Sequence, residues 1–386
     1  MSRAKALILE LLSQANIEIN GPKDDDIHVH HNAFYDRVLK EGALGLGESY
    51  MDKWWDCRAL DIFFTKIFQA NLTDKIKNSK RFLFKILLNK LFNFQNYHRA
   101  FEVGRKHYDL DDNLFQNMLD SRMNYTCGYW HNVNNLEEAQ LAKLELICQK
   151  LLLKPGMRML DIGCGWGGFA KYAAEKYHVE VVGITISKAQ QLLAQKLCNH
   201  LPIEIRLEDY RQLHGKFDRI ASIGMFEHVG FKNYNTFMKV VKNCLHENGL
   251  FLLHTIGNNK ATMTNEWITK YIFPNGMIPS IKLIADASEN DFVMEDWHNF
   301  GADYDKTLMA WHHNISYRWP HLPKKYDERF QRMWSYYLLS CAGAFRARKM
   351  QLWQIVFSPQ GIFNGYQAPR SIVKVAPASQ DYATIL

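Results

Sequence analysis

The stretch LDIGCGWGGFA, Leu160 to Ala170, carries glycines at positions 163, 165, 167 and 168. A short apolar run precedes it and the amphipathic run GGFAKYAAEKY continues it, so the sequence predicts a strand, a glycine turn and a helix. Gly163, Gly165 and Gly168 also match G-x-G-x-x-G, a pattern typical of dinucleotide sites. The first question is whether this turn binds a dinucleotide or another adenine-bearing cofactor.

Strand-like and helix-like segments alternate around this turn. We expect strands at 157–163, 179–187, 203–209, 217–224 and 249–257, and helices at 167–177, 188–198 and 233–245. Such alternation predicts an α/β fold in which helices cover both faces of a mostly parallel sheet. Ligands of such folds bind at the carboxyl ends of the strands.

The second predicted strand argues against a dinucleotide. In dinucleotide folds an acid at the end of this strand binds the ribose, but here the strand ends in Gly-Ile-Thr-Ile-Ser and its only acid, Glu180, lies at its start. An acid, Asp161, instead precedes the glycines. This arrangement suits a cofactor without phosphates, because the glycines make room for a methionine-like portion and Asp161 can hold its amino group, directly or through a neighbour. The sequence therefore predicts S-adenosylmethionine (SAM) in place of NAD.

The composition fits a folded protein of two domains, or of one large domain with an appendage. The formal net charge of +7 suits acidic lipid or nucleic acid but identifies neither. Seven cysteines without a C-x-x-C pair indicate neither a disulfide framework nor a zinc ribbon, and we expect no metal. Glu10 interrupts the N-terminal apolar run, and no apolar run reaches about 18 residues. We therefore expect no signal peptide, no membrane-spanning helix and a cytoplasmic location.

The regions outside the alternating segments are less specific. In residues 1–75, apolar residues recur at helical spacing, which predicts a small helical unit; they are Leu7, Leu11, Leu12, Phe34, Val38 and Leu39. The segment 41–55, EGALGLGESYMDKWW, is either a turn between helices or a surface for a partner or lipid. The basic stretch 71–106 contains an amphipathic helix that lies either in a membrane interface or against a neighbouring domain. Aromatic residues after position 290 form a core or an apolar channel, and the tail after Ser358 is expected to be loosely ordered.

Six long motifs, in one order, resemble those of the cyclopropane-fatty-acyl-phospholipid synthase family. They are LDIGCGWGG, VVGITISKAQQ, FDRIASIGMFEHVG, LLHTIG, KYIFPNG and DWHNFGADYDKTLMAW. The segments GLGESYMDKWW and SCAGAFRAR also match, so the resemblance covers nearly the whole chain. The mycolic acid cyclopropane synthases are similar more distantly.

This resemblance implies a Rossmann-like class I SAM methyltransferase domain, with a mostly parallel seven-stranded sheet, after a small helical N-terminal domain. The implied reaction moves the SAM methyl carbon onto the cis double bond of an unsaturated phospholipid acyl chain and closes a cyclopropane ring, with bound bicarbonate as the base. It also implies a homodimer that contacts the membrane peripherally at its inner face. We divide the chain into a lipid- or partner-binding domain at 1–75, a basic linker at 76–100 and a catalytic domain at 101–386.

The same resemblance assigns site residues. The cofactor contacts are Tyr125, Thr126, Leu160, Asp161, Ile162, Gly163, Cys164, Gly165, Trp166, Gly167, Thr185, Ile186, Ser187, Gln190, Asp209, Tyr210 and Arg211. The bicarbonate site consists of Cys127, Glu227, His254 and Tyr304 with the backbone of Ile256, and Cys341 matches a cysteine that the family has had labelled as active. The family has Tyr-Ser-Cys where this chain has Tyr125-Thr126-Cys127, and threonine keeps the hydroxyl.

The chemistry supports part of this set independently. A cation that develops on an acyl chain is stabilised by aromatic faces and a nearby anion, and the released proton needs a base. Glu227 follows one predicted strand and His254 ends another, so both suit a site, although an acid at a helix N-terminus and a buried structural histidine are the alternatives. We interpret His228 and Cys341 as structural residues and Cys127 as a wall of the anion site.

Three other functions compete with this interpretation. The first is a SAM methyltransferase for a small molecule, a protein or RNA, although the basic stretch pairs its charge with an apolar stripe and shows no RNA-binding motif, so we expect no nucleic acid. The second is a membrane-associated module that has lost catalysis, which the intact glycine turn disfavours. The third is an NAD dehydrogenase, which the missing ribose acid disfavours.

Overall fold

The computed structural model describes residues 2–72, 112–274 and 276–370. They form two compact units that are not continuous in sequence. The first takes its described residues from 1–96, 263–276 and 304–351, and the second takes them from 97–262, 277–303 and 352–386. The units differ from the divisions expected at 1–75, 76–100 and 101–386, because two stretches of the expected catalytic domain cluster with the N-terminal helices. The expected linker at 76–100 lies outside the described residues.

The second unit is built on a seven-stranded sheet in the order β10-β11-β7-β6-β3-β4-β5. The pairs from β7 to β5 are parallel, whereas β10 and β11 are antiparallel. This confirms the α/β fold and the seven strands. The strands are β3 (Arg158–Ile162), β4 (Glu180–Thr185), β5 (Ile203–Leu207), β6 (Phe217–Ile223), β7 (Leu245–Gly257), β10 (Val293–Asn299) and β11 (Gln351–Ser358).

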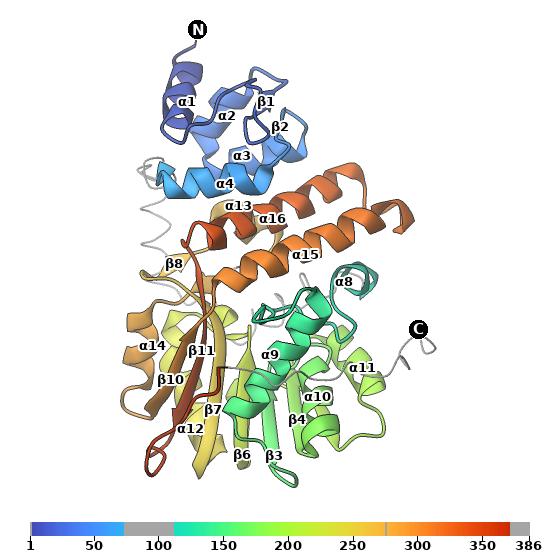
Figure 1. Ribbon diagram of the computed structural model, residues 1–386, viewed down its shortest axis with the longest axis vertical. Coiled ribbons are helices and arrows are strands. Elements are labelled where there is room, and N and C mark those ends of the chain that lie inside the picture. Colours follow the sequence, from blue (N-terminus) through green and yellow to red (C-terminus); the bar gives the residue numbers. More distant parts are fainter. Residues whose placement is uncertain (1, 73–111, 275, 371–386) are drawn as a thin grey trace. The chain divides into compact units, whose positions relative to one another are not determined.

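Helices cover both faces of this sheet, as the alternating pattern predicted (Figure 1). On one face α9 (Leu136–Lys150) and α10 (Gly168–Tyr177) enclose one apolar core, and on the other α12 (Tyr234–Cys244) and α14 (Ile281–Ser288) enclose a second. Four of the five residues of β3 are buried, as expected for a strand with helices on both sides of its sheet. The remaining elements are α8 (Asp112–Met118), α11 (Lys188–Leu197), β8 (Thr262–Met263), β9 (Met277–Ile278) and the 3-10 turns η2 (Tyr210–Gln212), η3 (Phe226–His228) and η4 (Phe231–Asn233).

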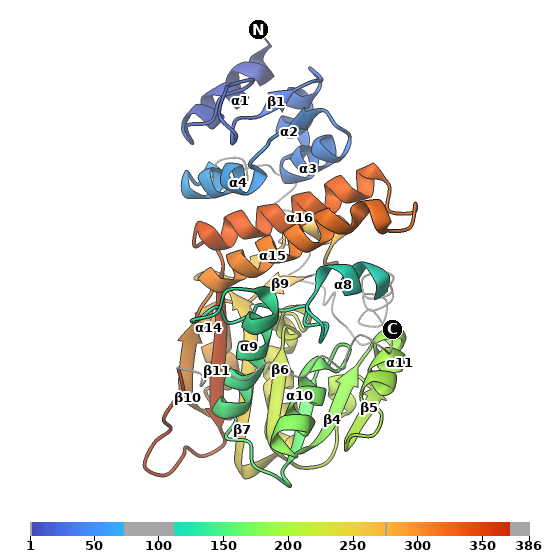
Figure 2. The same ribbon diagram turned by 45° about the vertical axis from the view of Figure 1, so that its right-hand side comes forward.

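The first unit is helical and has an aromatic core. Its long helices α15 and α16 lie side by side, and α4 lies along α16 (Figure 2). This close approach needs Gly343, where a Cβ would lie 2.7 Å from the Cβ of Phe64. The elements are α1 (Arg3–Ser13), β1 (His28–Val29), α2 (Phe34–Glu41), α3 (Ala43–Met51), β2 (Trp55–Asp56), α4 (Leu60–Gln69), α13 (Glu266–Tyr271), α15 (Ala302–Arg318), η5 (Trp319–His321) and α16 (Glu328–Arg346). No helix in the described ranges has the length and apolarity needed to cross a bilayer.

Two details of the first unit differ from the sequence-based expectation. Leu7 is 43% exposed, because the buried face of α1 follows Ala4, Ile8 and Leu12. The segment 41–55 is mainly the helix α3, which is largely buried, and not a turn. Gly47 lets it pack against Trp267, whose ring would lie 2.3 Å from a Cβ at that position. The glycines of this segment therefore serve close helix packing within the unit.

The chain after β11 is anchored as far as residue 370, which corrects the expected loose tail for that part. The amide of Ile362 donates to Glu295 Oε1 at 2.8 Å, and the Tyr366 hydroxyl donates to the carbonyl oxygen of Lys150 at 2.7 Å. Arg370 pairs with the Asp296 carboxylate. The sequence pattern missed this order because side-chain contacts to distant residues, and not a periodic apolar face, hold the segment.

Candidate active site

The candidate residues of the second unit lie where its parallel strands end. Asp161 and Thr185 are at the ends of β3 and β4, and Asp209 follows β5. Glu227 follows β6, and His254 in β7 pairs with Ile223 at the end of β6. Because β3 connects to β4 on one side and pairs with β6 on the other, the strand order reverses here, which is where α/β sheets bind ligands.

The glycine turn leaves space at the end of β3. Gly165 has φ +55°, and apart from its chain neighbours no atom of the described residues lies within 4 Å of the position where its Cβ would be. Gly163 has φ +87°, and a Cβ there would lie 2.8 Å from Met225 Cβ. Both positions therefore favour glycine, one to leave room for a ligand and one to avoid a clash. The side chains of Leu160 and Ile162 lie in the apolar core, so only their backbone atoms face the site.

Asp161 is the acid of this turn, and its hydrogen bonding is incomplete. Its side chain is buried, and its Oδ1 has no hydrogen-bond partner among the described residues. Burial raises the pKa of Asp161 to about 7, although the positive charge of Lys143 acts in the opposite direction. A buried carboxylate oxygen without a partner is costly unless a ligand completes it. The atom therefore suits the ammonium group of a ligand.

The turn after β4 is held by its own hydrogen bonds. Ser187 Oγ accepts from the Gln190 amide at 3.2 Å and caps α11. Thr185 Oγ1 donates to Gln190 Oε1 at 2.8 Å and accepts from the Ser187 amide at 3.2 Å. Ile186 is half-buried. Ser187 and Thr185 thus shape the turn. Ile186 and the side-chain nitrogen Nε2 of Gln190 remain as the candidates for ligand contact.

The turn after β5 contains a carboxylate that is already engaged. Asp209 is buried and accepts from the Arg211 backbone amide, Nε and Nη2 at 2.7 to 2.9 Å. Tyr210 packs on Phe237, and its Oη has no partner within the described ranges. Burial raises the pKa of Tyr210 to about 12, so its hydroxyl stays protonated.

The segment that contains Tyr125, Thr126 and Cys127 is held from both sides. Phe115 of α8 contacts the rings of Tyr125 and Trp166 at centroid distances of 5.1 and 5.0 Å. Thr126 packs against the backbone of Gly224, where a Cβ would lie 2.6 Å from Thr126 Cγ2. Cys127 is fully buried and its thiol donates to the Gly128 carbonyl at 3.2 Å. The segment therefore lies at the ends of β6 and β7.

Glu227 is held at one oxygen and open at the other. Its Oε1 accepts from the Ile256 amide at 2.7 Å, and its Oε2 has no partner in the described part of the chain. Burial raises the pKa of Glu227 to about 7 against the effect of this hydrogen bond. The Ile256 amide thus positions Glu227, and the predicted contact of the Ile256 backbone with an anion stays a prediction. The 3-10 turn η3 and the parallel pairing of β6 with β7 place the two residues together.

His254 is a buried neutral imidazole. Burial, with the charges of Lys143 and Lys150, lowers the pKa of His254 well below its ordinary value. Gln354 Nε2 lies 3.3 Å from His254 Nδ1; with the Gln354 amide in this orientation, Nδ1 accepts and Nε2 carries the proton. That Nε2 has no partner among the described residues. It is a donor suited to an anion.

Tyr304 and Cys341 belong to the first unit, whereas Cys127, Glu227 and His254 belong to the second. Tyr304 contacts Phe345 and Trp311 at ring distances of 4.6 and 6.0 Å. Its place in the anion site stays a prediction. Burial raises the pKa of Cys341 to about 12, so it is a thiol and a poor nucleophile near neutral pH. This supports a structural role for Cys341.

The family model described as Mycolic acid cyclopropane synthetase matches residues 95–355, more than half of the chain. The chain belongs to this family. It is 56% identical to the cyclopropane-fatty-acyl-phospholipid synthase of Escherichia coli K12 over 362 residues, which are 94% of each chain. The cyclopropane synthase MmaA2 from Mycobacterium tuberculosis is 32% identical, with a TM-score of 0.64, over 67% of this chain and 97% of that one. The mycolic acid cyclopropane synthase CmaA1, complexed with SAH and CTAB, is 33% identical, with a TM-score of 0.62 over the same shares.

The buried polar atoms that have no partner among the described residues divide into two groups, which can be compared with the ligands expected for this family. Asp161 Oδ1, beside the open turn at Gly165, fits the ammonium group of SAM. Glu227 Oε2 and His254 Nε2 fit a small anion, provided that the carboxyl is protonated toward it. The residues thus fit both groups that the sequence predicts.

Several polar residues of this site escaped the sequence analysis. Lys143 and Gln140 of α9 hold Thr126, and Gln354 of β11 orients His254. Each is a polar residue whose side chain is buried on the core-facing side of its element. A polar residue at a core position of a strand such as QLWQIVFS is the signal that could have indicated Gln354.

Proposed function

We propose that this chain is a SAM-dependent cyclopropane-fatty-acyl-phospholipid synthase. It adds the methyl carbon of SAM across the cis double bond of an unsaturated phospholipid acyl chain. The observation that carries the proposal is the 56% identity, over 94% of each chain, to the E. coli enzyme of that name. The open polar atoms at the strand ends support it, because they supply a cation contact and an anion contact in one buried site.

The reaction needs positioning more than acid catalysis. Bound SAM supplies a methyl group whose C–S bond breaks as a C–C bond forms to one alkene carbon. Ring closure then forms a second C–C bond and releases one proton. Asp161 anchors the ammonium end of the cofactor, and the turn at Gly165 leaves room for its methionine portion. An oriented, water-free pair of reactants can lower the barrier by roughly 7–11 kcal/mol, which a weak nucleophile such as an alkene requires.

The released proton needs an acceptor near Glu227 and His254. A bicarbonate ion held by His254 Nε2, by a protonated Glu227 and by the wall at Cys127 would supply that base. A pKa of about 7 lets Glu227 be protonated at neutral pH, which gives the anion a donor where an ionised carboxylate would repel it. We include Tyr304 in this site by family resemblance. His254, which burial keeps neutral, donates a hydrogen bond to the anion without carrying a positive charge.

Membrane contact, cytoplasmic location and a homodimer complete the proposal. The substrate chains lie in a bilayer, so the enzyme binds the inner face of the membrane peripherally. The basic segment with Lys75, Lys77, Lys80, Arg81 and Lys85 is our candidate for that contact, and it lies outside the described residues. Five exposed lysines of the second unit, Lys176, Lys196, Lys232, Lys239 and Lys260, provide a charge-matched control. Neutralising the first set, but not the second, should reduce sedimentation with anionic vesicles.

Lipid mass spectrometry tests the activity. Purified protein, SAM and bicarbonate buffer are incubated with vesicles of monounsaturated phospholipid. We expect a gain of one CH2 per acyl chain with loss of the double bond, and bicarbonate-depleted buffer should slow it. A CH2 gain with the double bond kept would mean methylation without ring closure. SAM binding without any lipid product would point to a methyltransferase with another substrate.

A further inference from the structure

Helix α9 carries two lysines that are almost fully buried, Lys143 at 1% exposure and Lys150 at 0%. Buried ammonium groups are rare unless they are paired. Lys150 lies 3.1 Å from Asp296 Oδ2 and 3.2 Å from His298 Nδ1, which explains its burial. Lys143 is different, because its Nζ donates to two neutral oxygens, Asn124 Oδ1 at 3.2 Å and Thr126 Oγ1 at 3.0 Å.

Thr126 is one of the residues that we assign to cofactor contact, and Asn124 lies two residues before it in the same segment. Gln140, one turn before Lys143, donates to the Thr126 carbonyl at 2.8 Å. Thr126 packs against Gly224, whose amide donates to the His254 carbonyl at 2.9 Å. One face of α9 therefore fixes the segment 124–127 against the ends of β6 and β7. Replacing Lys143 by an apolar residue would leave the Thr126 hydroxyl without this donor.

The charge of Lys143 also acts on Asp161. Its ammonium opposes the effect of burial on the pKa of Asp161, while the other groups that face Asp161, Cys164 and Cys198, are thiols whose pKa values burial raises. Lys143 itself faces Asp120, Cys127 and Asp161, and its charge lowers the pKa of His254. Near neutral pH the thiols are uncharged, so Lys143 is the cation that favours an ionised Asp161.

We propose that Lys143 is a positioning residue for the cofactor, which holds Thr126 in place and whose positive charge favours the carboxylate form of Asp161 that accepts the ammonium group of SAM. This inference rests on the proposed function, because it takes Asp161 as the ammonium contact. Lys143 touches neither the methyl group nor the alkene, and it acts through Thr126 and Asp161.

The test measures the affinity for S-adenosylhomocysteine (SAH) between pH 5.5 and 8.5 by calorimetry. SAH keeps the ammonium group, and 5′-methylthioadenosine, which lacks it, is the comparison ligand. The variants are Lys143→Met, which removes charge and donors, and Lys143→Gln, whose amide can still donate to Thr126. Lys150→Met is the matched control, because it removes the other buried ammonium of the same helix.

In the wild type, SAH should bind more weakly as the pH falls through about 7, because Asp161 becomes protonated, and methylthioadenosine should not show this dependence. Both Lys143 variants should move the midpoint of the pH dependence of SAH binding upward by about one pH unit, which is roughly a fivefold loss of affinity at pH 7. Lys150→Met should leave the midpoint unchanged. In an Asp161→Asn background, Lys143→Gln should have no further effect on the pH dependence.

The outcomes separate the two claims. If SAH and methylthioadenosine show the same pH dependence in the wild type, the assignment of Asp161 is wrong, and the proposal for Lys143 fails with it. If the SAH affinity of the wild type has a pH midpoint near 7 but neither Lys143 variant moves that midpoint, only the role of Lys143 is overturned. An equal shift in Lys150→Met would also overturn it, because the effect would then reflect general destabilisation. Should Lys143→Met fail to fold, Lys143→Gln decides alone.

Discussion

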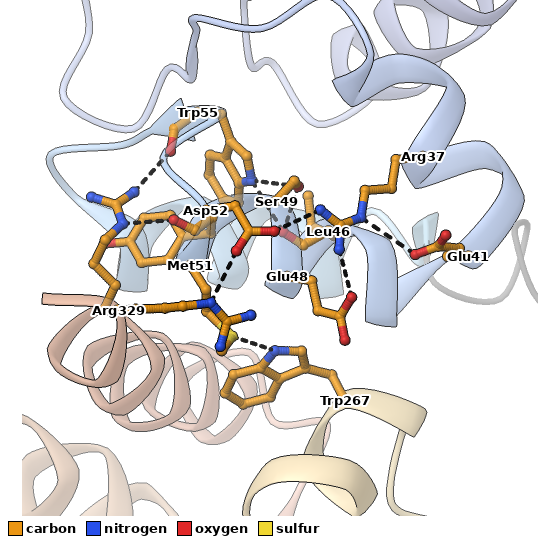
Figure 3. Close-up of polar contacts among 12 residues, drawn as sticks. Arg37, Glu41, Leu46, Glu48, Ser49, Met51, Asp52, Trp55, Trp267 and Arg329 are labelled. Carbon is orange, nitrogen blue, oxygen red and sulfur yellow. Dashed lines mark hydrogen bonds and ion pairs between the residues drawn. The ribbon is translucent and has the colours of Figure 1, made fainter. Parts of the chain in front are cut away.

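The polar cluster around Arg37 in the first unit and the open polar atoms of the second unit serve opposite purposes. In the first unit, Arg37 pairs with Glu48 and Asp52 (Figure 3). Lys270 and Tyr271 add two further hydrogen bonds to Glu48. Arg329 contacts the other oxygen of Asp52. In the second unit, Asp161 Oδ1, Glu227 Oε2 and His254 Nε2 are buried without a partner in the described residues.

This difference separates a structural network from a site. A buried charge that is fully paired within the protein stabilises one packing arrangement and has no capacity left for a ligand. A buried polar atom without a partner costs free energy that a ligand can recover. The open atoms of the second unit therefore indicate binding, whereas the network around Arg37 indicates helix packing. Substitutions should have opposite consequences in the two places.

Glu227→Ala should give the largest effect. Cyclopropanation should fall by about 10²- to 10⁴-fold, the range for loss of a group that assists proton transfer, because the anion that takes the proton loses its carboxyl donor. Glu227→Gln is the matched variant: its side chain can still accept from the Ile256 amide and donate to the anion, so it should lose less rate and no folding stability. The measurement is initial rate by lipid mass spectrometry across pH 6 to 8, with SAH affinity as the control for an intact cofactor site. A near wild-type rate for Glu227→Ala would remove Glu227 from the mechanism.

Asp161→Asn should stabilise the ligand-free protein while it weakens SAH binding. The folded pKa of about 7 lies above the ordinary value of 3.8, so the folded protein holds a proton that the unfolded chain releases as pH rises between these values. Stability of the wild type therefore falls over that window, and the gain from Asp161→Asn should reach about 2–4 kcal/mol above pH 7 and vanish below pH 4. Urea denaturation at pH 4 and 7.5 checks the sign. A loss of stability at pH 7.5 would show that Asp161 is satisfied within the protein.

Pattern and chemistry predicted the segment of the chain whose fold is signalled locally in the sequence. The strands and helices from 157 to 257 alternate in sequence, and the glycine turn with Asp161 follows a buried strand, so local signals were sufficient. The edge strand β10 was missed because VMEDWHN is polar and half-exposed, and a bulge between Met294 and Asp296 breaks its alternation.

The remaining errors come from long-range contacts. Gly47 looks flexible in sequence, but its role is to admit the ring of Trp267, more than two hundred residues away. Gln354 and Lys143 act through His254 and Thr126, which neither periodicity nor motif spacing connects to them. Local patterns record which face a residue occupies, but they do not record which distant side chain it meets there.

Glu48→Gln should mainly reduce stability. It removes the charge that balances Arg37 and Lys270 in a largely buried position, so the free energy of unfolding should fall by about 2–3 kcal/mol. Asp286→Asn is the control, because its pair with Lys282 is exposed and should contribute less than about 0.5 kcal/mol. Denaturant unfolding measures both, and the rate per folded molecule should be unchanged for each. A large loss of rate without loss of stability would place Glu48 in a site.

Cys341→Ala should give the smallest effect and tests the interpretation of that cysteine directly. The pKa of about 12 keeps its thiol protonated, and cyclopropanation needs no covalent cysteine intermediate, so the rate should stay within about twofold. Stability should fall by no more than about 1 kcal/mol, because a partly buried thiol is lost from α16. Cys127→Ala is the comparison, since that thiol lies in the unit with the open polar atoms and its removal should slow the reaction more. If Cys341→Ala instead abolished activity and left stability intact, the cysteine would belong to the reacting site, and the division between a structural unit and a binding unit would have to be redrawn.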